Sequence, residues 1–164
     1  MSNGLGSLIN KLEEKIKNPS KGLPEEIFLL ISRLSPLINV DLLIMNKKKE
    51  ILLTWRSKGE KFDEGWHIPG GIIRFKDSIK NRLNYVAKNE LNVQIKQNFK
   101  LVDIFEIKLK QKNRSHFISL LYLCHLKSSL DNKNKFFGKK PKTGEWKWFK
   151  KSPKKLIYPH KVYK

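Results

Sequence analysis

Apolar positions along the chain follow two periods, one typical of helices and one typical of strands. Helical spacing covers 7–17 and then 23–34, where Pro24 and two acidic residues stand in the first turn. Continuous apolar runs predict strands over 38–45 and 51–56, separated by a short polar turn. We expect these two strands to form a hairpin.

The rest of the chain alternates in the same way. Segment 66–73 is short extended backbone bent by one proline and two glycines, and helical spacing returns over 78–91. Two long strand-like runs follow at 99–110 and 115–127, and a short strand is expected at 145–149 after a basic loop. Strands on both sides of a central helix predict a mixed α/β domain with an antiparallel or mixed sheet.

Composition narrows the class of protein. A chain of 164 residues is expected to form one domain, and its net charge of +20 favours polyanionic partners such as nucleotides, nucleic acid or acidic membranes. The alternative is that most lysines form a solvated surface. Cys124 is the single cysteine, so no intrachain disulfide can form, and we expect a reducing, cytoplasmic compartment. The N-terminal stretch lacks a basic start followed by an apolar run, and no run reaches the about 18 apolar residues of a membrane span, so we expect neither a secretory signal nor a membrane-spanning segment here.

The stretch "GWHIPGGIIRFKD" and the helix after it carry the candidate chemistry. They resemble the signature of the Nudix hydrolases, G-x5-E-x7-R-E-U-x-E-E-x-G-U, where U is a bulky apolar residue. Gly71 falls on the first Gly, Asp77 on the first Glu, Glu90 on the last Glu and Val93 on the closing apolar position. Four positions depart from the signature, and they are occupied by Tyr85, Val86, Asn89 and Asn92.

An abbreviated signature of this kind resembles the GDP-mannose mannosyl hydrolase branch of the family. The resemblance covers residues 24–93 and includes "EEIFLLISRLSPLINVDLLIMNKKKEILLTWR". It implies a Nudix-like α/β/α sandwich with a mixed β-sheet, preceded by N-terminal helices. The expected domains are an N-terminal helical extension over 1–22, the hydrolase domain over 23–150 and a basic C-terminal tail over 151–164.

The resemblance implies Mg²⁺-dependent hydrolysis of a GDP-mannose-like nucleoside diphosphate sugar or a related derivative, with Mn²⁺ as the alternative cofactor. The Gly70 carbonyl and the Glu90 carboxylate would be metal ligands, and Asp41 would stand near the metal and the substrate. Arg56 would bind the diphosphate, and Phe28 would lie near the nucleotide base. Relatives in this branch form dimers through their N-terminal part, so the resemblance also implies a homodimer.

One expected feature is missing from the sequence. Lys142 and Thr143 stand where that branch has a Gln ligand and a His general base. The substitutes that the sequence offers for the base are Glu145, His67, His116 and His160. Three alternatives therefore stay open: attack at phosphorus instead of the sugar carbon, a degenerate module that binds nucleotide without turnover, and a basic nucleic-acid-binding domain.

Overall fold

A computed structural model describes residues 3–59 and 64–163, so the predicted polar loop before Gly65 lies partly outside the described residues. The elements, in chain order, are α1 (Asn3–Glu14), α2 (Glu25–Leu34), β1 (Leu37–Ile44), β2 (Ile51–Arg56), β3 (Gly65–His67), β4 (Gly70–Ile72), α3 (Ile79–Leu91), β5 (Lys100–Lys108), β6 (His116–Cys124), the 3-10 helix η1 (Asn132–Asn134), β7 (Trp146–Phe149) and the 3-10 helix η2 (Tyr158–Tyr163).

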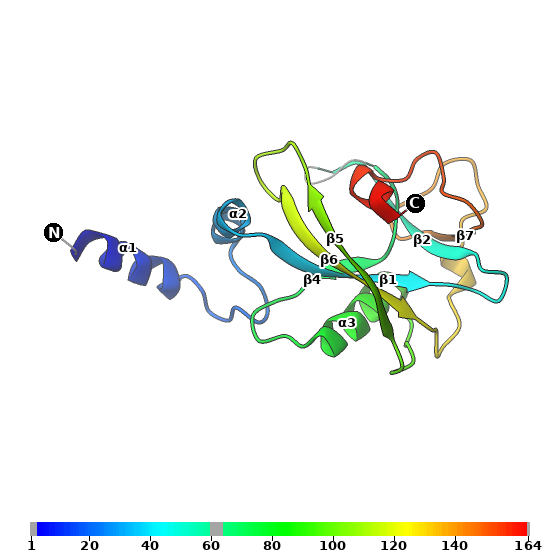
Figure 1. Cartoon of the computed structure of the whole chain (residues 1–164), viewed down its shortest axis with the longest axis horizontal. Helices are drawn as coiled ribbons and strands as arrows, with labels where there is room; N and C mark the ends of the chain where they lie inside the picture. The colour runs from blue at the N-terminus through cyan, green and yellow to red at the C-terminus, as the bar shows by residue number, and fades with distance from the viewer. Residues whose placement is uncertain (1–2, 60–63, 164) are drawn as a thin grey trace.

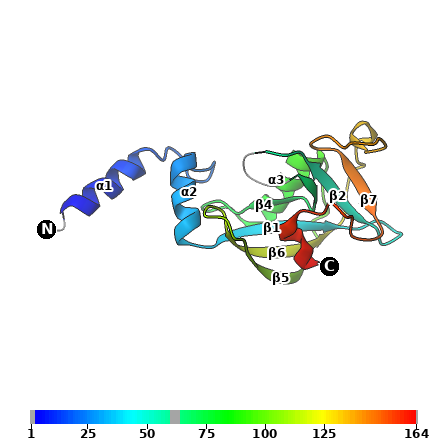
Figure 2. The ribbon, with the colours of Figure 1, turned by 90° about the horizontal axis from the view of Figure 1, so that it is seen from above.

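The strands form two sheets. One has the order β4-β1-β6-β5, and the other has the order β3-β2-β7. Strand β1 pairs parallel with β6 and antiparallel with β4, so the predicted mixed α/β fold is confirmed. Helix α3 lies behind the larger sheet in Figure 1, and the C-terminal 3-10 helix lies on the other side of β1 in Figure 2.

The predicted hairpin of 38–45 and 51–56 is wrong. The two strands share one isolated bridge, between Met45 and Ile51, and then diverge into different sheets. Both edges of each strand are already occupied, because β1 lies between β4 and β6 while β2 lies between β3 and β7. The turn itself is tight, and the side-chain oxygen of Asn46 accepts from the Lys48 backbone amide at 2.9 Å.

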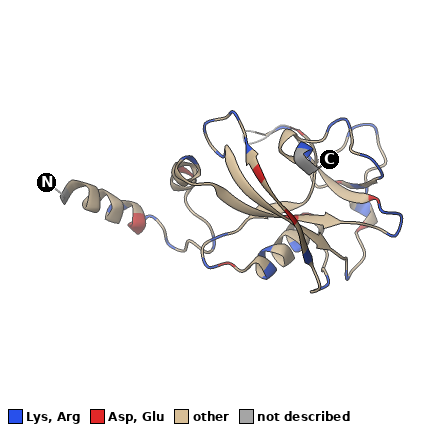
Figure 3. Ribbon diagram, viewed as in Figure 1, with Lys and Arg blue, Asp and Glu red and all other residues tan. Residues whose placement is uncertain are grey.

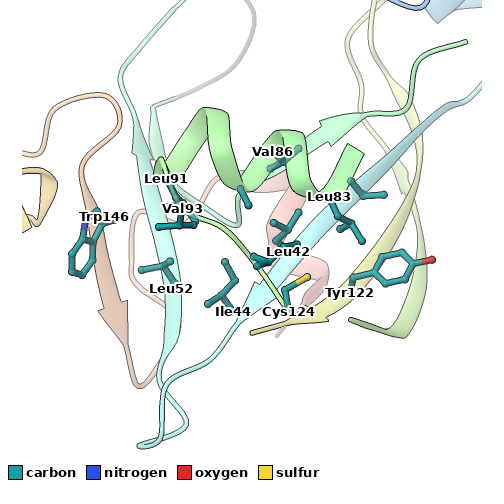
Figure 4. Packing of buried hydrophobic residues seen from close by; sticks show 13 residues of the cluster. Leu42, Ile44, Leu52, Leu83, Val86, Leu91, Val93, Tyr122, Cys124 and Trp146 are labelled. Carbon is teal, nitrogen blue, oxygen red and sulfur yellow. The ribbon is translucent and has the colours of Figure 1, made fainter. Parts of the chain in front are cut away.

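Helix α3 covers one face of the fold with an apolar stripe. Leu83 and Leu91 of the helix face the strands beneath it, where Leu42 and Leu52 lie (Figure 4). The next residue on β2, Leu53, belongs to a second cluster on the opposite face, as the two-residue period of a strand requires. Each such buried side chain contributes about 1.5–3 kcal/mol to stability, so α3 is held firmly against the sheets.

Local contacts fix both ends of α3, and they give a structural reason for Asn92 at a position where the resembled signature has Gly. The Ser78 hydroxyl accepts from the Asn81 backbone amide at 3.1 Å and caps the start of the helix. Asn92 ends the helix in the left-handed conformation with φ 53°, which asparagine tolerates almost as glycine does. Asp77 accepts from Nε of Arg82 at 2.7 Å and therefore holds the loop to the helix.

The C-terminal segment packs against the domain. The Trp66 backbone amide donates to the Lys155 carbonyl at 2.8 Å, and the Ile157 amide donates back to the Trp66 carbonyl at 3.0 Å. Ile157 and His160 are buried. The segment expected as a basic tail thus brings His160 beside β3.

Helix α1 extends away from the rest of the fold (Figure 1), with exposed apolar side chains that include Leu5 and Leu8. Within residues 3–59 and 64–163, no helix is long and apolar enough to cross a bilayer. Lys and Arg residues are spread over the loops and α3 (Figure 3), so the net charge is not concentrated on one element.

Candidate active site

A cavity of about 200 Å³ lies where the two sheets meet. Its wall includes, among others, Asp41 from β1, Arg56 from the end of β2, His67 from β3, Gly70 from β4 and His160 from η2. Residues that are distant in the sequence therefore surround one small space. Three predicted site residues, Asp41, Arg56 and Gly70, are among them.

Asp41 is 2% exposed, so its carboxylate depends on hydrogen bonds from the protein. Its Oδ2 atom accepts from Nδ2 of Asn39 at 2.8 Å and from the hydroxyl of Ser119. Asn39 reaches Asp41 because residues two apart on a strand share a face. The carboxylate is thus held in one orientation at the cavity wall.

Arg56 brings a positive charge to the same cavity. Burial lowers the pKa of its guanidinium, while the carboxylates of Glu90 and Asp41 act in the opposite direction. A guanidinium keeps its proton in proteins, so Arg56 is a fixed cation that interacts with both carboxylates. Its planar donors are suited to paired oxygens of a phosphate.

Glu90 lies behind the cavity and contacts two of its wall residues. Its Oε1 atom accepts from the Gly70 backbone amide at 3.1 Å, and its Oε2 atom lies 3.3 Å from Nε2 of His67. A carboxylate only accepts, so a hydrogen bond here places the His67 proton on Nε2 and leaves Nδ1 as an acceptor in the neutral ring. The same Nε2 atom is 3.2 Å from the hydroxyl oxygen of Thr54.

His160 is fixed in one tautomer. Its Nδ1 atom accepts from the Ile68 backbone amide at 2.9 Å, which requires that Nδ1 carry no proton. Burial lowers the pKa of His160 well below its usual value, and the nearby His67 and Arg56 add to this effect. The ring is therefore neutral, with its proton on Nε2.

The other predicted residues lie elsewhere. His116 is 3.0 Å from the Glu106 carboxylate, and Glu145 accepts from the Lys142 backbone amide at 2.8 Å. Neither His116 nor Glu145 is part of the cavity wall. Of the four substitutes for the general base, the structure places His67 and His160 at the cavity.

Phe28 lines a second, larger cavity of about 440 Å³ that adjoins the first. The guanidinium carbon of Arg114 lies 4.5 Å above the centre of its ring. Gly71, Ile72 and Arg114 belong to the walls of both cavities, so the two lie next to each other.

Two polar residues of the smaller cavity, Asn39 and Arg114, were not predicted from the sequence. In the described part of the chain, three buried side-chain atoms lack a hydrogen-bond partner: Oδ1 of Asn39, Nδ1 of His67 and Nε of Arg114. All three residues line this cavity. Asn39 stands two residues before Asp41 on the same strand, so the sequence alone indicates that both side chains lie on one face. Arg114 lies in a polar turn, and no sequence pattern there indicates a place in the cavity wall.

The donor set fits one divalent ion better than several. No group of three or more His, Cys, Asp or Glu side chains suited to a metal occurs within residues 3–59 and 64–163. Two carboxylates do converge on Gly70, because Asp41 is its register partner and Glu90 accepts from its amide. Mg²⁺ is often held by one or two carboxylates with water and substrate phosphates completing its shell, so these residues fit a single ion.

Comparisons with known proteins place the chain in a family. The family model for the NUDIX domain matches residues 36–153, and the chain belongs to the Nudix family. Membership of this family supports hydrolase activity. A search of curated proteins gave no match.

Solved structures show the same fold. A MutT NUDIX hydrolase from Burkholderia pseudomallei has a TM-score of 0.58 and 18% identity, covering 78% of this chain and 95% of that one. A NUDIX hydrolase from Nitrosomonas europaea has a TM-score of 0.53 and 15% identity, covering 70% and 72%. A MutT protein from Methanosarcina mazei Go1 has a TM-score of 0.51 and 20% identity, covering 70% and 78%.

Proposed function

We propose that this chain hydrolyses a GDP-mannose-like nucleoside diphosphate sugar, or a related nucleoside diphosphate derivative, in the smaller cavity. The observation that supports the proposal best is the gathering of Arg56, the Asp41 carboxylate and three unpaired buried polar atoms around one space, with the Glu90 carboxylate behind its wall. Buried polar atoms without partners are costly, by about 1–3 kcal/mol each. Phosphate oxygens and sugar hydroxyls would supply both the acceptors and the donors that these atoms need.

Each residue then has a role. Arg56 binds the diphosphate oxygens, and Phe28 lies near the base in the adjoining cavity. Glu90 and the Gly70 carbonyl hold one Mg²⁺ or Mn²⁺ ion, with Asp41 beside it. When bound, the ion neutralises charge on the departing nucleoside diphosphate.

His67 is the general base in this proposal. Its Nδ1 atom has no partner among the described residues, and Glu90 orients the ring through Nε2. A base oriented in this way accepts the proton of the attacking water at Nδ1, and the Glu90 carboxylate stabilises the imidazolium that forms. His160 is less suited, because its Nδ1 atom already accepts from the Ile68 amide.

The test is product release from a panel of GDP- and UDP-sugars with Mg²⁺. Wild-type protein is expected to turn over at least one of them, and Glu90→Gln is expected to lose about 100-fold or more in kcat. Glu106→Gln is the matched control, because Glu106 is outside the cavity and pairs with His116 and Lys108. No turnover of any substrate, or equal turnover by Glu90→Gln, would contradict the proposal.

The site of attack is a separate question within the same proposal. Hydrolysis in ¹⁸O-labelled water puts the label in the sugar when water attacks carbon and in the phosphate when it attacks phosphorus. We expect label in the sugar, as in the branch that the sequence resembles.

A nucleotide-binding module without turnover is the second candidate function. It is favoured by the small number of carboxylates, since no group of three metal-ligating side chains occurs in the described residues. It predicts thermal stabilisation by GDP with no product from any substrate. A nucleic-acid-binding role rests on the +20 charge alone, and it predicts binding that weakens steeply with salt.

A further inference from the structure

Arg114 occupies the junction of the two cavities, on the turn between β5 and β6. Its side chain is 12% exposed and lines both the smaller and the larger cavity. The larger cavity also contains Phe28 and Tyr85, whose rings give it flat apolar walls. Because Arg114 is part of both walls, a ligand that occupies both cavities lies against its side chain.

The backbone at Arg114 is held in an uncommon conformation. Its φ of 52° lies in the left-handed region, where glycine and asparagine are favoured over arginine. Two hydrogen bonds fix the turn: the Arg114 amide donates to the Ser32 hydroxyl at 3.2 Å, and the Arg114 carbonyl accepts from the Gln111 side chain at 2.8 Å. The turn thus presents this side chain toward α2 and the junction.

The guanidinium is positioned by two contacts but is not fully used. Its Nη2 atom lies 2.9 Å from Oε1 of Glu25, and its carbon lies 4.5 Å above the Phe28 ring. Its Nε atom is buried without a partner in the described part of the chain. A guanidinium with an unused buried donor, set between two cavities, is prepared to bind an oxygen of a ligand.

We infer that Arg114 selects nucleoside-bearing diphosphates over free inorganic pyrophosphate. It binds a phosphate or ribose oxygen at the point where the ligand leaves Arg56 and enters the larger cavity, which takes the nucleoside. This inference rests on the proposed function, because it assumes that the diphosphate lies at Arg56. It adds a specificity-determining residue on a segment that carries none of the Nudix signature.

Calorimetric titration with GDP and with inorganic pyrophosphate, each with Mg²⁺, tests the inference. Arg114→Asn removes the guanidinium and keeps a residue that tolerates the left-handed backbone. We expect its affinity for GDP to fall at least tenfold and its affinity for pyrophosphate to change less than threefold. Arg114→Lys keeps the charge but lacks the planar donors, and it should lose about fivefold or more for GDP.

Arg33→Asn is the matched control, since Arg33 is an exposed residue of α2 that donates to Asn113 and lines neither cavity. It makes the same change in charge and should leave both affinities unchanged. If both Arg114 variants bind GDP as wild-type protein does, or lose GDP and pyrophosphate equally, the inference is wrong and the proposed function stands. If wild-type protein binds neither ligand, the proposed function fails as well.

Discussion

Gly70→Ala is expected to damage the site more than any neighbouring glycine substitution. A Cβ atom at Gly70 would overlap Oδ1 of Asp41 and would lie 3.1 Å from its Cγ and 3.0 Å from the Val40 carbonyl oxygen. The carboxylate has no room to yield, because it is buried and its other oxygen accepts from Asn39 and Ser119. Strand β4 must therefore move away from β1.

The size of the effect follows from two contributions. Overpacking costs about 1–3 kcal/mol, and a weakened hydrogen bond to a buried charge adds about 1.5–3 kcal/mol. A loss of about 3 kcal/mol lowers Tm by about 6–12 °C in a chain of this size.

Gly71→Ala is the matched control for this prediction. A Cβ atom there meets Cγ2 of the buried Val86 at 2.9 Å and Cδ of Arg82 at 3.6 Å, so it crowds a methyl group of the core and leaves the hydrogen-bonded Asp41 carboxylate in place. We expect Gly71→Ala to lower Tm by less than half as much as Gly70→Ala does. Differential scanning calorimetry of both variants measures the difference, and equal Tm values for Gly70→Ala and wild type, or equal losses in both variants, would refute the reasoning.

Two further predictions follow from the buried groups. In the folded protein the pKa of His160 is lowered, so below about pH 6.5 the unfolded chain takes up a proton that the folded chain excludes. The contribution of His160 to stability is therefore complete above about pH 6.5. Below that pH the free energy of unfolding falls by up to about 1.4 kcal/mol per pH unit. His160→Asn keeps an acceptor for the Ile68 amide, and it should lose this pH dependence of the free energy of unfolding, measured by urea unfolding between pH 7.5 and 5.5. The same pH dependence in the variant and in wild-type protein would contradict this prediction. Burial raises the pKa of the Cys124 thiol to about 12, so a thiol reagent at pH 8 should label unfolded but not folded protein.

Local sequence patterns were sufficient to predict structural features that depend on a single helix, strand or turn. A carboxylate inside the apolar run of β1 marked Asp41, and the Pro-Gly-Gly bend marked the place where β4 approaches it. The strands and α3 also followed from periodicity, because each element has a buried face that repeats along its own length, but periodicity left both an antiparallel and a mixed sheet open.

Contacts between segments that are distant in the sequence could not be predicted from local patterns. His160 meets the Ile68 amide across 92 residues, and no pattern in a basic tail indicates that contact. The separation of β1 from β2 depends on which strands occupy their edges, and this is decided by the whole topology. Arg114 lies at the two cavities because the β5–β6 turn packs against Ser32 of α2.

The proposed hydrolysis is tested most directly by following GDP-mannose in ³¹P NMR with wild-type protein, first with Mg²⁺ and then with excess EDTA. The proposed single-ion site at Glu90 and Gly70 predicts that the substrate signals give way to those of GDP with Mg²⁺, stop changing when EDTA is added and change again when Mg²⁺ is restored. Substrate signals that persist with Mg²⁺, or that disappear equally fast in EDTA, would contradict it.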